Sequence, residues 1–258
     1  MSSPTTQPDS PASAGTGASQ SRGFFGHPWG LANLAGVEMW ERFSFYGMQA
    51  LLAFYIYYSV TDGGLGMSQA AATSIVGAYG GLVYLSAVLG GWIADRVLGA
   101  ERTLLIAACL IMVGHLALAF IPGMLGLAIG LVGVALGSGS LKTTTSTVLG
   151  DLYEKGDQRR DAAFSIYYMG VNIGGFAGPL LTSALWGWKG FHWGFGLAAI
   201  GMAIGLIQYL AMRKHTVSAS SMKPGNPLSA SQKRIWTVVL LAAIAVIALA
   251  LSFGFITA

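Results

Sequence analysis

Charged residues are scarce in this 258-residue chain, since Asp, Glu, Lys and Arg together make up only 9% of it. Ordinary soluble domains carry about 25% charged residues, because a soluble surface needs polar cover. A soluble enzyme is therefore excluded, and the 54% apolar content excludes a disordered or collagen-like chain. The single cysteine, Cys109, leaves no disulfide framework and no cysteine-rich metal site. We expect an integral membrane protein, not an enzyme, with no cofactor and no metal.

Seven apolar stretches run along the chain, each close to the ~20 residues that a helix needs to cross ~30 Å of hydrocarbon. Turn-forming sequences separate them, such as Thr61-Asp62-Gly63-Gly64, Pro122-Gly123 and the segment 186–190. The stretches do not alternate as the strands of a membrane barrel do. We predict an all-α transmembrane fold, a six-helix bundle plus one additional helix, from the stretches 31–59, 69–94, 103–121, 124–150, 162–187, 191–212 and 235–256.

The polar segments mark the predicted domain organisation. Residues 1–27 are rich in Ser, Pro, Thr and Gly and contain no apolar run, which predicts a disordered tail and not a signal peptide. The bundle then occupies residues 28–213. A polar segment with Pro and Gly, 214–234, is predicted to be a cytoplasmic linker to a seventh helix at 235–258.

Lys and Arg gather on one side of the predicted membrane. If the N-terminus is cytoplasmic, the outer loops hold only Lys189, whereas the inner loops hold Arg22, Arg96, Arg102, Lys155, Arg159, Arg160, Arg213, Lys214, Lys223, Lys233 and Arg234. This is the positive-inside asymmetry of membrane proteins. We predict a multi-pass protein of the cytoplasmic (inner) membrane with its N-terminus inside, and the net charge of +4 needs no nucleic-acid partner.

Two predicted spans carry ionisable groups far from their ends. Glu38, Glu41 and Arg42 lie three or four positions apart on the first span, so they are neighbours on one helix face. Arg42 lies ~16 Å of helix rise from the inner end of the first span, and Lys142 lies ~14 Å from the inner end of the fourth, so both reach the midplane. A charge there costs roughly 2.5–3.5 kcal/mol. We therefore expect a shared cavity with mutually neutralising charges.

Such a cavity offers a way to couple proton and substrate movement. A ligand carboxylate that arrives at Arg42 or Lys142 would release a glutamate to take a proton. Residues on the same helix face or on neighbouring spans are candidates for its lining: Phe45, Tyr46, Gln49, Tyr84, Ser138, Thr145, Ser146, Tyr168 and Asn172. The alternative is a static ion-pair cluster that only fixes helix packing.

Glycine is abundant, with 37 copies. Several pairs have the four-residue spacing that lets helix backbones approach closely in lipid, among them Gly170, Gly174 and Gly178. Tight helix packing explains these pairs. Helices that must rock against each other would show the same pattern, so glycine alone does not indicate transport.

The sequence Glu38-x-x-Glu41-Arg42-Phe-Ser-Phe-Tyr46-Gly47 resembles the ExxER signature of the proton-dependent oligopeptide transporter family, a branch of the major facilitator superfamily. Three further segments are similar to the superfamily's loop motif, the fourth-span lysine pattern and the family's fifth-span signature: 91–102, 137–142 and 164–176. Together they cover residues 28–212, in order. The resemblance implies symport of di- and tripeptides with protons by alternating access.

The resemblance also implies residue roles. Glu38, Glu41 and Arg42 belong to proton coupling, and a cytoplasmic gate is formed by Asp95, Arg96 and Arg102. The substrate-binding set is Arg42, Tyr46, Gln49, Tyr84, Lys142, Tyr168 and Asn172, with Lys142 near the peptide carboxylate. Gln49 stands where many members have Arg, which removes a positive charge from the cavity.

Members of this family hold substrate between two six-helix bundles, and this chain resembles the N-terminal one. The resemblance therefore implies that a C-terminal half or a second copy completes the cleft within the lipid bilayer. Two alternatives remain open. One is a relative that carries another small solute, such as nitrate or a peptide-like drug. The other is a truncated, non-transporting membrane subunit or remnant.

Overall fold

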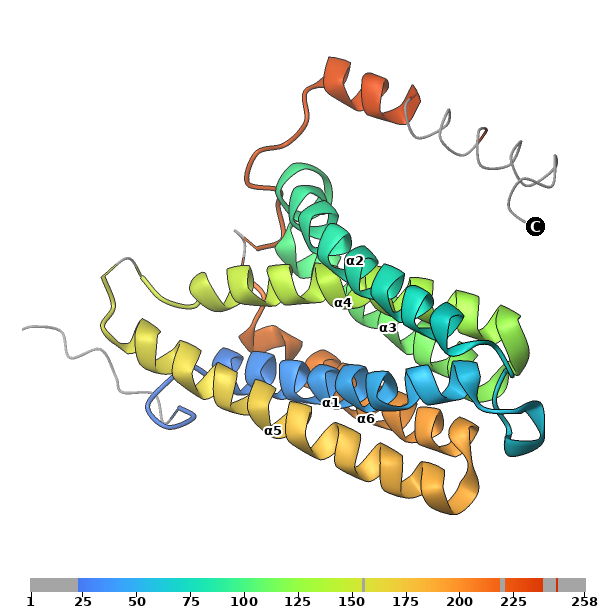
Figure 1. Ribbon diagram of the computed structural model, residues 1–258. Helices are drawn as coiled ribbons and strands as arrows, with labels where there is room; N and C mark the ends of the chain where they lie inside the picture. The colour runs from blue at the N-terminus through green and yellow to red at the C-terminus, as the bar shows by residue number, and fades with distance from the viewer. Residues whose placement is uncertain (1–22, 155, 219–220, 239–244, 246–258) are drawn as a thin grey trace, which may run out of the picture.

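A computed structural model describes residues 23–154, 156–218, 221–238 and 245 of the chain. Six long α-helices run back and forth through it (Figure 1): α1 (Trp29–Tyr57), α2 (Gln69–Ile93), α3 (Ala100–Phe120), α4 (Gly123–Gly150), α5 (Arg159–Lys189) and α6 (Phe191–Met212). Three short helical turns connect or follow them: η1 (Val60–Asp62), η2 (Ala94–Leu98) and η3 (Arg213–His215). Among the described residues, the only β-type backbone pairing is one isolated bridge between Phe24 and His27.

The all-α fold predicted from the sequence is confirmed, and six of the apolar stretches match helices to within three residues at each end. The seventh stretch, 235–256, lies mostly outside the described residues, although residues 230–238 are helical. The predicted turn-forming segment 186–190 is reduced to a single residue in the structure. Helix α5 continues to Lys189, and Gly190 alone turns the chain, since its φ of 97° and ψ of 174° are open to glycine.

Among the residues that the structure describes, four helical segments are long and apolar enough to cross a membrane: Gln69–Leu98, Ala100–Phe120, Gly123–Gly150 and Phe191–His215. Helices α1 and α5 are as long, with 29 and 31 residues, but they carry more polar groups. In α1 these include Glu38, Glu41 and Arg42, all of which are buried inside the bundle. Composition alone therefore underestimates the number of helices that belong to the transmembrane bundle.

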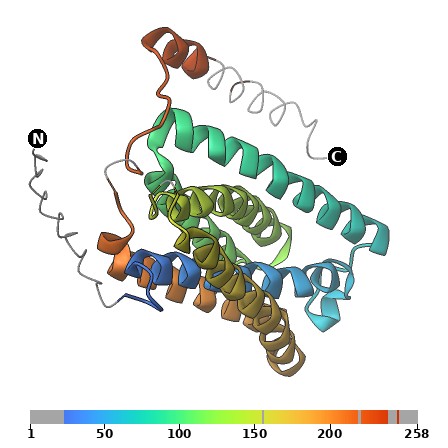
Figure 2. The same cartoon turned by 90° about the vertical axis from the view of Figure 1, so that its left-hand side faces the viewer.

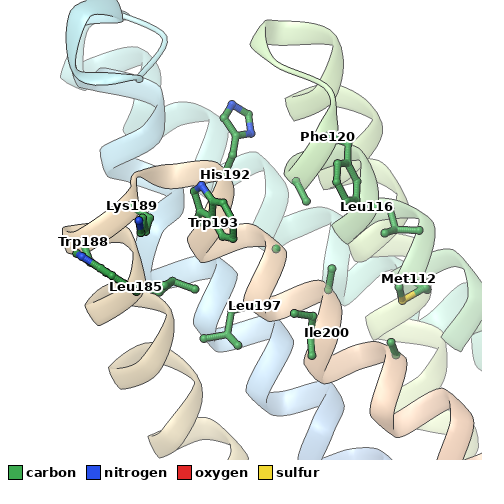
Figure 3. Close-up of a pocket in the computed structure, with 14 residues that line it drawn as sticks. Met112, Leu116, Phe120, Leu185, Trp188, Lys189, His192, Trp193, Leu197 and Ile200 are labelled. Atoms are coloured by element: carbon green, nitrogen blue, oxygen red, sulfur yellow. The ribbon is translucent and has the colours of Figure 1, made fainter.

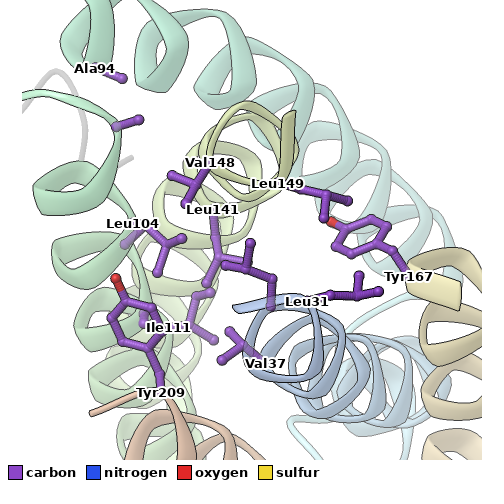
Figure 4. Close-up of a cluster of buried hydrophobic side chains, with 14 of the residues drawn as sticks. Leu31, Val37, Ala94, Leu104, Ile111, Leu141, Val148, Leu149, Tyr167 and Tyr209 are labelled. Atoms are coloured by element: carbon purple, nitrogen blue, oxygen red, sulfur yellow. The ribbon is translucent and has the colours of Figure 1, made fainter. Parts of the chain in front are cut away.

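Helix α1 lies between α5 and α6, helix α4 lies between α2 and α3, and contacts of α3 with α6 join the two groups (Figures 1 and 2). One apolar cluster fills the end of the bundle where α1 begins, with Leu31, Val37, Leu104, Leu141 and Tyr209 among its residues (Figure 4). A second cluster fills the other end and contains residues of α1 from Phe45 to Ile56. The charged residues of α1 lie in sequence between these two clusters.

Glycine brings α1 and α5 into backbone contact. A Cβ added at Gly170, Gly174 or Gly178 would meet backbone atoms of α1, namely those of Ala35, Met39 and Phe43. One turn farther along α5, the Thr182 hydroxyl donates a hydrogen bond of 2.9 Å to the carbonyl oxygen of Gly47. The predicted packing role of this glycine series is confirmed.

Residues 23–27, at the end of the predicted disordered tail, are folded in the structure. The buried His27 ring has Nδ1 3.0 Å from the hydroxyl of Tyr153, which follows α4. Arg159 Nη1 donates to the carbonyl oxygen of Gly26 at 3.3 Å and also pairs with Asp157, whose pKa its guanidinium holds below the usual range. The segment that precedes α1 is thereby attached to the connection between α4 and α5.

Part of the predicted linker, residues 221–228, is hydrogen-bonded to the helical bundle. The backbone N–H groups of Asn226 and Leu228 donate to the carbonyl oxygens of Asp95 and Arg96, at 2.9 and 3.2 Å, and Glu101 N–H donates to Ser221 at 3.0 Å. The acceptors Asp95 and Arg96 lie in η2, a π-helical turn. Residues 221–228 therefore run along the connection between α2 and α3 and supply its backbone partners.

We expect Gly99→Ala to destabilise this attachment. Gly99 has φ 86° and ψ 155°, and an added Cβ would lie 2.7 Å from the carbonyl carbon of Met222. Such a backbone conformation costs a non-glycine residue about 1–3 kcal/mol, and overpacking adds roughly 1–3 kcal/mol. The midpoint of unfolding in detergent would measure the loss.

Gly190→Ala is the matched control, because Gly190 has a similar conformation, φ 97° and ψ 174°, and nothing within 4 Å of an added Cβ. It should lose only the conformational part of the stability. Equal losses in the two variants would contradict the packing of Met222 against Gly99.

Candidate functional site

The charged residues of α1 form one buried cluster. Glu38, Glu41 and Arg42 have exposed fractions of 2%, 0% and 6%. Arg42 Nε lies 3.2 Å from Glu38 Oε1 and 2.5 Å from Glu41 Oε2, so two carboxylates share one guanidinium, as their spacing predicts. The cluster holds one negative charge in excess when both acids are ionised, and a proton or a cation would balance it.

Ser138 connects this cluster to α4. Its hydroxyl donates a 2.5 Å hydrogen bond to Glu41 Oε1, and Arg42 Nη2 donates to Ser138 Oγ at 3.3 Å. Ser138 is 1% exposed and stands one helical turn before Lys142. The sequence indicated Ser138 only as one of several candidate lining residues, because nothing in the sequence shows which residue of α4 meets Glu41.

A cavity of about 430 Å³ lies beside the cluster, between α1, α2 and α4. It brings together five of the predicted substrate-binding residues, Arg42, Tyr46, Gln49, Tyr84 and Lys142. Arg42 belongs to both the cluster and the cavity, whereas Glu38 and Glu41 do not line the cavity. A solute in the cavity would therefore meet the guanidinium first, with the carboxylates behind it.

Lys142 shares this cavity with Arg42, as the depth argument predicts, but it is not in contact with the acids. Its side chain is exposed, and none of the ion pairs found in the described part of the chain includes it. The expected mutual neutralisation is thus only partial, because Arg42 alone pairs with the two acids and Lys142 does not contribute. Lys142 is left available to an anionic group in the cavity.

Two predicted substrate-binding residues are not brought into this cavity. Tyr168 and Asn172 lie on an exposed side of α5, where the Asn172 side chain donates to the Tyr168 carbonyl oxygen at 2.9 Å. Neither residue lines the cavity between α1, α2 and α4. Their predicted role would need a second surface that faces this side of α5.

The predicted gate residues lie at the end of the bundle where α1 begins. Asp95 is exposed and Arg96 half-buried in η2, and Arg102 is exposed on α3. The strong polar contact at this end is made instead by Glu101, which is fully buried and accepts from the Tyr209 hydroxyl at 3.0 Å and from Arg213 Nε at 2.5 Å. Sequence reasoning missed Glu101. The available signal is an acidic residue at the start of one apolar span together with an arginine at the end of an antiparallel span.

The fold and the site together define a class: a multi-pass helical membrane protein with a polar, solute-sized cavity and a buried charge cluster at its wall. Residues 101–253 match the model of the POT family, and the chain belongs to that family. The transmembrane helices thus have the fold of a transporter family, and the family resemblance read from the motifs is confirmed.

Individual relatives agree. The chain is 46% identical over 208 residues to an uncharacterised transporter of Bacillus subtilis, covering 81% of this chain and 42% of the relative. It is 44% identical over 219 residues to a di-/tripeptide transporter of Lactococcus lactis subsp. cremoris, covering 84% and 44%. A crystal structure of a peptide transporter of the POT family in complex with sulfate superposes with a TM-score of 0.88 at 45% identity, covering 91% and 48%. The chain spans about half the length of the relatives that it matches.

Proposed function

We propose that this chain forms the N-terminal half of a proton-coupled symporter for di- and tripeptides. The observation that carries the proposal is the position of Arg42, which pairs with two buried carboxylates on one side and lines the cavity on the other. In this proposal the protein lies in the cytoplasmic membrane with its N-terminus inside, because Lys and Arg gather at the end of the bundle where α1 begins.

The proposed coupling step starts at the substrate carboxylate. When it binds between Arg42 and Lys142, it draws the Arg42 guanidinium toward the cavity and away from Glu41. A buried carboxylate that loses its cation is strongly disfavoured, so Glu41 takes a proton. Ser138 can then rotate its hydroxyl to follow the change, because a hydroxyl both donates and accepts.

The second half of the cleft is proposed to face the exposed side of this cavity. Tyr84 is 76% exposed and Tyr46 is 40% exposed at its rim. Exposed aromatic and cationic groups around a polar cavity are suited to a covering surface and not to lipid. A C-terminal half, or a second copy, would close the cavity around the peptide, and gate movement at Asp95, Arg96 and Arg102 would release it to the cytoplasm.

Uptake of a labelled dipeptide into proteoliposomes tests the proposal. The chain is reconstituted alone and also joined to the C-terminal half of a di-/tripeptide relative. Accumulation by the joined protein that needs an imposed pH gradient, and that a proton ionophore collapses, supports symport. If the intact relative accumulates dipeptide and the joined protein does not, a non-transporting subunit is favoured instead.

We expect Lys142→Gln to weaken dipeptide binding by roughly 10–100-fold, because a hydrogen bond to a charged group contributes about 1.5–3 kcal/mol. Equilibrium binding of a labelled dipeptide to the joined protein would measure the change. Lys214→Gln, which removes the same charge after α6, should leave affinity unchanged. Equal affinities in the two variants would remove Lys142 from the binding site.

A further inference from the structure

An apolar groove runs along α6, away from the polar cavity. One hollow of about 660 Å³ lies between α3, α5 and α6, and a second of about 320 Å³ lies between α1, α5 and α6. Leu197 and Ile200 line both hollows. Leu185 lines the first hollow and Leu181 the second, and these two residues are one turn apart on α5. The two hollows therefore form one continuous groove, here called the α6 groove.

The residues at the mouth of the α6 groove differ in polarity from those of its apolar interior (Figure 3). Trp188, Lys189 and Trp193 surround its mouth, and the two indoles are 75% and 61% exposed. The Lys189 ammonium lies 4.4 Å from the centroid of the Trp188 ring. Tryptophan at this position is typical of the level of lipid headgroups, so the mouth opens at the membrane–water interface.

Lys189 stands alone at its end of the bundle. Within the described ranges, the loops and helix ends around it carry no other Lys or Arg, and none of the ion pairs found there includes it. A lone, exposed cation above an apolar groove is complementary to a molecule with one anionic group and a long apolar chain.

The length of the groove matches one leaflet. From Trp193 at the mouth to Ile204 at the far end, α6 rises ~17 Å, about half of the ~30 Å hydrocarbon thickness. The lining beyond the mouth is apolar, with Met39, Phe43 and Ile173 at the inner end. An acyl chain fits this depth, whereas a peptide would leave its backbone groups without partners there.

We propose that the α6 groove binds one acyl chain of an anionic phospholipid, whose phosphate pairs with Lys189. The shape, lining and charge of the groove support this binding, which is independent of the proposed transport function. An anionic headgroup gains about 1 kcal/mol from one nearby lysine, which corresponds to a roughly fivefold preference over a zwitterionic lipid.

Two variants test the groove itself. Gly196 lines it, and an added Cβ there has no atom within 4 Å, so Gly196→Leu adds an apolar side chain to the groove from a position where its Cβ meets no neighbour. Gly77→Leu on α2 is the matched control, because its Cβ also meets nothing within 4 Å and Gly77 does not line the groove. Lys189→Gln tests the charge, with Lys214→Gln as its control at the other end of the bundle.

Native mass spectrometry of the full chain, purified and supplied with phosphatidylglycerol or phosphatidylcholine of identical acyl chains, gives the readout. For the parent chain we expect retained phosphatidylglycerol to exceed retained phosphatidylcholine about fivefold. Lys189→Gln should remove that preference. Gly196→Leu should lower retention of both lipids roughly tenfold. The two control variants should behave as the parent chain.

Three results would overturn the proposal. The first is equal lipid retention in Gly196→Leu and Gly77→Leu, which means non-specific contact with the bilayer. The second is a preference that persists in Lys189→Gln. The third is a dimer that Gly196→Leu dissociates while bound lipid is unchanged, because a second copy of the chain would then occupy the groove.

Discussion

Replacing Glu41 by Gln is expected to abolish proton-driven accumulation of dipeptide. Glu41 is fully buried, contacts the Arg42 guanidinium and accepts the Ser138 hydrogen bond. Glutamine has nearly the same shape but neither loses nor gains a proton, so the step in which substrate at Arg42 releases a proton acceptor cannot occur. Uptake under an imposed pH gradient should fall by at least about a hundredfold, as for other essential proton-transfer groups.

The same variant should retain counterflow, in which labelled dipeptide exchanges for unlabelled dipeptide without net proton movement. Glu154→Gln is the control, because Glu154 is an exposed acid after α4. Both variants are made in the protein joined to a complementary C-terminal half. If Glu41→Gln accumulates dipeptide as the parent does, the cluster is a static packing device and the coupling proposal fails.

Much of the fold was predictable because each helix is read from local sequence. Apolar stretches set the helix positions, and the three- and four-residue spacing of Glu38, Glu41 and Arg42 sets their contacts. What sequence could not supply is the partner across a helix interface. The Glu41 contact with Ser138 and the burial of Glu101 against Tyr209 depend on how helices rotate and slide against each other.

Tyr168 and Asn172 illustrate why sequence alone could not assign every residue of the candidate site. Each is two residues from Gly170, and two residues turn an α-helix by ~200°. Gly170 faces α1, so both residues must point away from α1 and out of the cavity that Arg42 lines. The glycine series therefore indicates which face of α5 Tyr168 and Asn172 occupy, but only once α1 is known to be the helix that packs against these glycines.

The linker attachment was also beyond sequence reasoning. Its segment, 221–228, is polar and contains Pro and Gly, which is typical of a free connection. Its hydrogen bonds to Asp95 and Arg96 use backbone atoms alone, and backbone contacts leave no mark on residue identity. Only Gly99, which has room for no side chain beside Met222, carries a trace of it in the sequence.

Gly174→Ala is expected to cause a large loss of stability. An added Cβ would collide with the carbonyl oxygen of Met39 and would lie 3.0 Å from the backbone nitrogen of Phe43. Backbone atoms within helices cannot move aside singly, so α5 must shift away from α1 as a body. Overpacking of this kind costs roughly 1–3 kcal/mol and sometimes more. The midpoint of unfolding in detergent should fall accordingly.

Gly175→Ala provides a sharp comparison, because it adds the same methyl group one position along the same helix. There the nearest atoms belong to the Tyr46 ring, at 3.3 and 3.5 Å, and a side chain can adjust. The helix itself gains about 0.5–1 kcal/mol when alanine replaces glycine, so this variant should be neutral or slightly stabilised. Since Met39 lies between Glu38 and Glu41, the shift caused by Gly174→Ala should also disturb the charge cluster. Equal stability of the two variants would mean that α1 and α5 are not in backbone contact in the folded protein.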